Sequence, residues 1–116
     1  MTSDFYRDNT PNWYAARVKY QTEKKIKSFL EDEKIEHYIP FEMVVRERNG
    51  KKIQKEKPVI PCLIFVHTDY HTALSLPDSS GFSISYIRNL EAQKLQTIPD
   101  KQMQDFMFVL DFSETT

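Results

Sequence analysis

Glycine and cysteine are scarce in this sequence, and each shortage excludes a group of functions. The 116 residues contain 2 glycines, Gly50 and Gly81, and a single cysteine, Cys62. A dinucleotide-binding fingerprint or a P-loop needs clustered glycines so that backbone amides can approach phosphates, so neither motif is present. One cysteine excludes a disulfide framework and every zinc site that requires two or more thiolates.

Long hydrophobic runs are also missing. No apolar stretch approaches the roughly 20 residues that cross a bilayer, and no signal-peptide hydrophobic region follows Met1. We therefore expect a soluble, cytoplasmic protein that makes no membrane contact. With 40% hydrophobic and 28% charged residues, the chain is expected to fold as one domain around a modest core.

The near-neutral net charge of −1 conceals two basic segments. Basic side chains outnumber acidic ones between residues 17 and 27 and again between residues 46 and 57. Two such segments can form a local surface for an anionic partner. From composition alone, however, the simpler interpretation is a set of solvated lysines without a ligand.

Hydrophobic periodicity and turn residues predict an α+β sandwich, with a mainly antiparallel sheet and flanking helices. Asn49-Gly50 suits a two-residue type I′ hairpin, whose charged return strand cannot be buried and should project from the body. The order of expected elements follows. Strands are expected at 12–18, 37–45, 51–57, 62–66 and 83–87. Helices are expected at 22–34, capped by Thr22, at 70–76, ended by Pro77, and after Thr97 as N-cap. The last helix has Pro99 just inside its start and an apolar stripe at Met103, Phe106, Met107 and Leu110.

Nothing in the sequence indicates catalysis. His67 and His71 have the i, i+4 spacing of helical metal ligands, but their segment lacks an HExxH pattern and an obvious third ligand. Cys62 is expected inside an apolar strand, where a thiol is inert. We expect no enzyme, no cofactor, no metal and no small-molecule substrate, and a binding role is favoured.

Several landmarks resemble the NusG N-terminal (NGN) domain of bacterial transcription elongation factors. They are Trp13-Tyr14 opening the first strand, the IEHYIP stretch at 35–40, the VIPCLIFV strand at 59–66 and Ile98-Pro99-Asp100 before the last helix. The VIPxxIFV form and the C-terminal helix are similar to the Bacteroidetes branch of specialised NusG paralogues, which antiterminate capsular polysaccharide operons. The resemblance implies a flexible segment at 1–11, an NGN domain at 12–112 and the start of a linker at 113–116, with the C-terminal KOW domain absent from this chain.

The resemblance also implies partners. NGN domains bind the clamp helices of the RNA polymerase β′ subunit through a hydrophobic depression and suppress pausing; specialised paralogues also contact the non-template DNA strand. Carried over by position, Arg17, Leu63 and Phe65 are the expected polymerase-binding residues, and the domain is expected to be a monomer. The expected nucleic-acid contacts are Lys19, Lys24, Lys25 and Lys27, and the expected hairpin contacts are Arg46, Arg48, Lys51 and Lys52.

Two points stay open at the level of sequence. Leu63 and Phe65 share one face of an apolar strand, so core and interface fit that face equally well, and the resemblance favours the interface. The alternatives for function are a free-standing RNA-binding domain and a protein-interaction module that competes with NusG for polymerase. The RNA-binding alternative lacks the RNP1 pattern of alternating glycine and aromatic residues.

Overall fold

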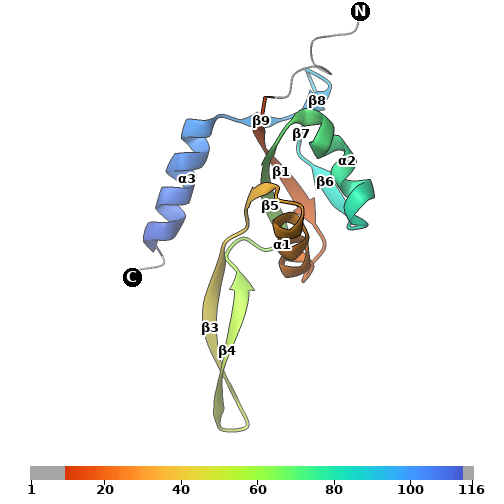
Figure 1. Ribbon diagram of the computed structural model, residues 1–116. Helices are drawn as coiled ribbons and strands as arrows, with labels where there is room; N and C mark the ends of the chain where they lie inside the picture. Colours follow the sequence, from red (N-terminus) through yellow and green to blue (C-terminus); the bar gives the residue numbers. More distant parts are fainter. Residues whose placement is uncertain (1–9, 114–116) are drawn as a thin grey trace, which may run out of the picture.

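A five-stranded, mainly antiparallel sheet forms the centre of the computed structural model, which describes residues 10–113 (Figure 1). The long antiparallel pair is β1 (Asn12–Val18) and β5 (Leu63–Thr68), with Asn12 opposite Thr68 and Arg17 opposite Leu63. β2 (Glu36–Tyr38) extends the sheet beside β5, and β6 (Ile84–Tyr86) extends it beside β1. The short β9 (Thr97–Ile98) also pairs with β1.

Helices cover both faces of this sheet. Alternate side chains of β1 point to opposite faces, so Tyr14 and Ala16 pack against α1 (Glu23–Asp32) and α2 (Tyr70–Ser80) in the larger core cluster. Trp13 faces the other way, toward α3 (Asp100–Ser113), which lies on the opposite side of the sheet in Figure 1. The predicted α+β sandwich with an antiparallel sheet and flanking helices is confirmed.

The predicted hairpin at Asn49-Gly50 is also confirmed, and it projects from the body (Figure 1). β3 (Phe41–Arg48) and β4 (Lys51–Pro58) form a separate two-stranded sheet, and both turn residues have positive φ, 53° for Asn49 and 76° for Gly50. This is the geometry that a type I′ turn demands. At the root, the Val59 amide donates to the Pro40 carbonyl at 2.9 Å, which joins the two strands where they leave the sandwich.

The strand expected at 37–45 is interrupted. It divides into β2, within the central sheet, and β3, within the hairpin, on either side of Ile39 and Pro40. Proline has no N–H to offer a sheet ladder, so the chain leaves the central sheet there. Ile39 is buried while Met43 and Val45, which continue its period-two pattern, are exposed at 60% and 61%. The pattern therefore runs from the core onto the surface.

Other predicted boundaries were wrong. α2 does not end at Pro77 but continues through it to Ser80, and Gly81 ends it in the left-handed conformation. Thr97 is not a helix cap: it lies in β9, and the Met103 amide donates to the carbonyl of Pro99 just before α3. Between the strand predicted at 83–87 and Thr97, the chain forms two further short strands, β7 (Arg88–Asn89) and β8 (Lys94–Leu95).

The expected N-terminal segment at 1–11 and linker at 113–116 lie outside the described residues, except for Thr10, Pro11 and Ser113. α1 is shorter than the expected 22–34 and stops at Asp32. None of the helices within residues 10–113 has the length and apolar content of a membrane span.

Candidate functional site

The sheet face toward α3 carries an aromatic cluster. Phe65 on β5 is 6% exposed and packs with Trp13 and Met103. Its ring centroid lies 5.3 Å from that of Phe106 on α3 and 6.5 Å from that of Tyr38 on β2. Of the two alternatives left open for Phe65, core and interface, the structure supports the core, because α3 lies over the ring.

Arg17 and Leu63 mark the part of this face that α3 leaves more open. They are directly opposite each other on β1 and β5, and they lie on the same face as the pair Ala15 and Phe65 two residues further along. Leu63 is half-buried at the edge of the aromatic cluster, and Arg17 is exposed. The structure thus brings the three predicted polymerase-binding residues onto one face. Their exposure increases from the buried Phe65 through the half-buried Leu63 to the exposed Arg17.

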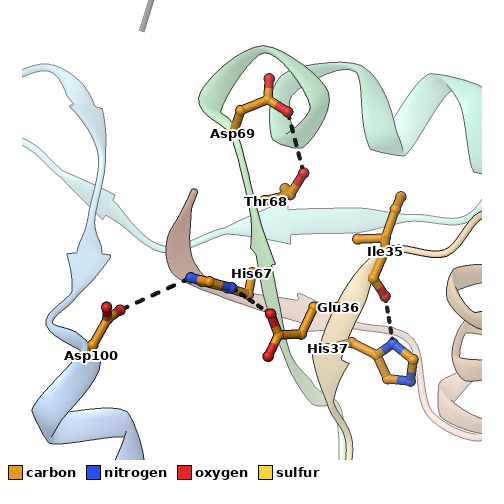
Figure 2. A network of polar contacts seen from close by, with 7 residues as sticks. All are labelled: Ile35, Glu36, His37, His67, Thr68, Asp69 and Asp100. Carbon is orange, nitrogen blue, oxygen red and sulfur yellow. Dashed lines mark hydrogen bonds and ion pairs between the residues drawn. The ribbon is translucent and has the colours of Figure 1, made fainter. Parts of the chain in front are cut away.

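A histidine links this face to the start of α3 (Figure 2). The His67 Nδ1 lies 2.7 Å from Glu36 Oε1 on β2, and its Nε2 lies 4.0 Å from Asp100 Oδ1 on α3. The imidazole also stacks on Trp13, with ring centroids 4.7 Å apart. His67 therefore connects two strands and a helix by polar and ring contacts.

The two histidines with metal-like spacing are separated by the fold. His67 lies in β5 and His71 is exposed on α2, with Asp69 between them as the N-cap of that helix. Within residues 10–113, no group of three or more histidine, cysteine or acidic side chains is arranged to hold a metal ion. Cys62 is not inside a strand as expected: it has a φ of 64° in the turn before β5, and its amide donates to Glu23 Oε2 at 2.8 Å.

The lysines of the first basic segment do not act as one row. Lys24 on α1 pairs with Glu56 of the hairpin, with Nζ and Oε1 3.1 Å apart. The Lys27 ammonium lies 5.2 Å from the centroid of the Phe41 ring, also at the hairpin root. Lys19, before α1, and Lys25 are exposed. The predicted DNA-contacting set is therefore divided between two lysines that face the hairpin and two that lie open.

The hairpin has two chemically different faces. Directly opposed residues of an antiparallel pair share a face, and every second residue along each strand returns to it. One face consequently carries most of the cations; its basic members are Arg46, Arg48, Lys51, Lys55 and Lys57. The other face carries Lys52 opposite Glu47, together with the exposed Met43 and Val45. Lys52 is therefore separated from the other predicted hairpin contacts, Arg46, Arg48 and Lys51.

A cleft of about 390 Å³ lies between the root of the hairpin and the start of α1. Its lining combines aromatic, basic and apolar side chains from both elements: Tyr20, Gln21, Glu23, Lys24, Phe41, Val44, Arg46, Lys55, Glu56, Lys57, Pro58 and Pro61. The Glu23 carboxylate is 1% exposed and accepts from the Cys62 amide, while Glu56 pairs with Lys24. Within residues 10–113, Arg46, Lys55 and Lys57 form no ion pair within 4.0 Å, and Glu42 lies directly opposite Lys57 on the same face of the hairpin.

The spacing of the basic residues along the sequence indicates the cationic side of this cleft. Arg46 and Arg48 alternate along one strand, and Lys51, Lys55 and Lys57 keep the same parity on the other. Reading that period predicts one cationic face. Tyr20, exposed at 71%, carried no comparable signal because its place beside the hairpin depends on tertiary packing.

Two ionisable groups away from these surfaces have shifted pKa values. Hydrogen bonds from the Thr72 side chain and amide, at 2.7 Å and 3.0 Å, lower the pKa of Asp69. Burial raises the pKa of Tyr86, and the neighbouring Tyr14 contributes in the same direction. Neither group lies in a cleft with a second reactive side chain, so we assign them to stability rather than to chemistry.

The chain matches a known protein family over most of its length. A family model described as "Transcription termination factor nusG" matches residues 11–107. No curated protein matches the chain. The match covers the sandwich, the hairpin and more than half of α3, and so includes every surface described above.

Proposed function

The chain belongs to the NusG family, and on this premise we propose that it binds the clamp helices of the RNA polymerase β′ subunit and suppresses pausing or termination. Membership assigns the chain to transcription elongation and termination factors, which associate with RNA polymerase. The proposal adds the surface and the effect on elongation, and it assigns no catalysis to the domain.

The open end of the α3-side face carries this proposal. Arg17 is exposed beside the half-buried Leu63, and Phe65 continues the same face beneath α3. An apolar patch with an exposed arginine beside it suits a protein partner, because arginine is one of the side chains in which interfaces concentrate binding energy. Phe65 then supports the surface from below, and Arg17 and Leu63 contact the partner.

Binding of purified core polymerase and of an isolated clamp-helix fragment tests this assignment. Arg17→Ala and Leu63→Ser should each weaken both interactions by about tenfold or more, as expected for residues near the centre of an interface. Two matched controls lie elsewhere: Arg88→Ala on β7 and Leu74→Ser on α2, where Leu74 is 40% exposed. Equal losses for test and control variants, or no loss for either test variant, would place the polymerase-binding surface elsewhere.

We also propose that the open lysines before and within α1 contact the non-template DNA strand. Lys19 and Lys25 are exposed, and Lys24 and Lys27 lie next to them on the hairpin side. Each phosphate contact releases counterions, so Lys25→Ala should lower the salt slope of recruitment to a paused elongation complex by about 0.7 to 0.9. Binding to the isolated clamp-helix fragment should stay unchanged. An unaltered slope and affinity would mean that Lys25 is solvated surface.

The resemblance of the VIPCLIFV strand to specialised paralogues supports a further assignment, antitermination at polysaccharide operons. The test is readthrough of a terminator placed behind a polysaccharide-operon leader, compared with the same terminator behind an unrelated leader. Readthrough that rises with the domain only on the first template supports operon-specific action. Equal readthrough on both templates would indicate a general elongation factor.

A further inference from the structure

We propose that the outer edge of β3 pairs with the same edge of a second copy of this chain, so that two hairpins join into one antiparallel sheet. The contact goes beyond the proposed function, because it uses neither the clamp-facing residues nor the open lysines and can be measured without polymerase. It joins only a few residues of each copy, so the monomer expected from the resemblance becomes a weak dimer at high protein concentration.

The outer edge of β3 carries backbone groups that the hairpin itself does not use. Within residues 10–113, β3 pairs with β4 and with no other strand. The Val59 amide donates to the Pro40 carbonyl at 2.9 Å, and opposed pairs of an antiparallel ladder alternate between hydrogen-bonded and non-hydrogen-bonded. From Pro40 onward, every second residue therefore turns its N–H and C=O away from β4. These residues are Phe41, Met43, Val45 and Glu47.

The two edges of the hairpin differ in how strongly they oppose a further strand. Four of the eight residues of β4 are lysines, and the strand ends at Pro58. Lysine and proline on an edge strand hinder the addition of another strand. The middle of β3 is instead an apolar run at 43–45, in which Met43 and Val45 are exposed at 60% and 61%. Because an isolated two-stranded hairpin is only marginally stable in water, pairing at this edge also stabilises the projection.

The centre of β3 is complementary to itself in the antiparallel direction. When Val44 lies on a two-fold axis opposite Val44 of the second copy, Glu42 lies opposite Arg46. Met43 then lies opposite Val45, and the symmetry produces each of these pairs twice. A shift of two residues in either direction places Val44 opposite a charged side chain instead. The sequence therefore favours one register, and it favours a second copy over an unrelated strand.

This register also agrees with the direction of the free backbone groups. Met43 and Val45, whose N–H and C=O point outward, become the hydrogen-bonded pairs across the new contact. The Glu42–Arg46 pairs fall in non-hydrogen-bonded positions, where opposed side chains approach most closely. Opposite charges and apolar side chains in such cross-strand pairs stabilise a sheet.

Disulfide trapping tests the register. In a Cys62→Ser background, Val44→Cys brings two thiols together on the two-fold axis, with Cα atoms about 4.5 Å apart, a distance that a disulfide spans. Mild oxidation should therefore give a covalent dimer. Lys55→Cys is the matched control, because Lys55 lies directly opposite Val44 on the same face but on β4, at the other edge of the hairpin. It should stay monomeric.

Sedimentation velocity over a series of protein concentrations tests the charged pairs. Glu42→Arg should weaken dimerisation by about tenfold or more, because both Glu42–Arg46 pairs become like-charge pairs. Combining Glu42→Arg with Arg46→Glu should restore the dimer, since each pair again joins opposite charges. The new charge at position 42 faces Lys57 in the single and in the double variant, so only the pairs between copies distinguish them.

The outcomes separate this pairing from other kinds of association. A covalent dimer of Val44→Cys together with rescue by the double variant supports the proposal. A wild-type chain that is monomeric at every concentration overturns it and leaves the edge to a strand of another protein. Equal trapping of Val44→Cys and Lys55→Cys also overturns it, as does a double variant that dimerises no better than Glu42→Arg, because either result indicates association without this register.

Discussion

At the scale of single residues, Tyr86 is the clearest case of a side chain with one group that destabilises the folded state. Its hydroxyl is buried, and no hydrogen-bond partner for it exists among the described residues. The ring nevertheless packs against the larger core cluster, with its centroid 6.1 Å from that of Tyr14. The ring stabilises the folded state, whereas the hydroxyl destabilises it. A buried polar group that lacks a partner loses its hydration without compensation.

Tyr86→Phe should therefore leave the free energy of unfolding unchanged or raise it by about 1 kcal/mol. Urea denaturation at neutral pH measures this. The raised pKa adds a second signature: the unfolded state loses the tyrosine proton from about pH 10 upward while the folded state keeps it, so wild-type stability falls there. The phenylalanine variant should lose less stability over the same alkaline range. A drop of more than 1 kcal/mol at neutral pH would show that the hydroxyl is hydrogen-bonded.

Phe65 gives a second prediction at this scale. Because α3 covers it, Phe65→Ser should lower the free energy of unfolding by about 3 kcal/mol or more, as large-to-small substitutions in a core do. Leu90→Ser, at a position that is 83% exposed, should stay within about 0.5 kcal/mol of wild type. If Phe65→Ser were as stable as this control, α3 would not lie on the sheet in solution.

At the scale of elements, α2 shows how a helix can contain a proline. Asp69 begins it as N-cap, with its carboxylate accepting from the Thr72 amide and hydroxyl, and Gly81 ends it with a φ of 76°. Ala73 and Leu76 bury its inner face. Because the helix is capped at both ends and packed in between, it tolerates the loss of the backbone hydrogen bond that Pro77 cannot donate.

Asp69→Ala should lower the free energy of unfolding by about 1 kcal/mol, the usual value of a lost N-cap. Because the folded-state pKa of Asp69 is lowered, its contribution is present above the unfolded-state pKa and disappears as the pH falls through the folded-state pKa. Asp69→Asn keeps a capping oxygen that does not titrate, so it should be less sensitive to acid than wild type. Chemical denaturation at neutral and at acidic pH compares the three proteins; equal acid sensitivity of wild type and Asp69→Asn would contradict this role.

Elements with local signals could be predicted from the sequence, and those fixed by tertiary packing could not. β1, α1 and the Asn49-Gly50 hairpin follow from aromatic, periodic and turn residues close together in the chain. The break at Pro40 and the extension of α2 depend on which sheet each segment joins and on what it packs against. For the candidate site the same division holds: the basic segments were visible, whereas the burial of Phe65 beneath α3 and the place of Tyr20 in the cleft depend on contacts between distant segments.

At the scale of the whole molecule, a packed body and a thin projection share one chain. The described structure extends 66 Å along its longest axis and only 31 Å and 27 Å across. Within residues 10–113 the hairpin strands pair only with each other, whereas β1 and β5 pair on two sides and are covered by helices on both faces. Stability should therefore differ strongly between the two parts.

Amide hydrogen exchange followed by mass spectrometry should show this difference. Peptides from β3 and β4 should exchange much faster than peptides from β5, because opening the hairpin exposes little apolar surface. The central part of β1 is the internal control for slow exchange. Equal protection of the hairpin and of β5 would mean that the projection packs against something in solution.

The contacts at the root of the hairpin determine how far its tip moves. The Val59–Pro40 hydrogen bond and the Lys24–Glu56 ion pair tie the two strands and α1 together at the base, and beyond them the ladder runs freely to Asn49 and Gly50. A small rotation of the hairpin about its root displaces the tip in proportion to the length of the hairpin. The direction of the hairpin, and with it the position of its tip, is therefore set by the few contacts at its root.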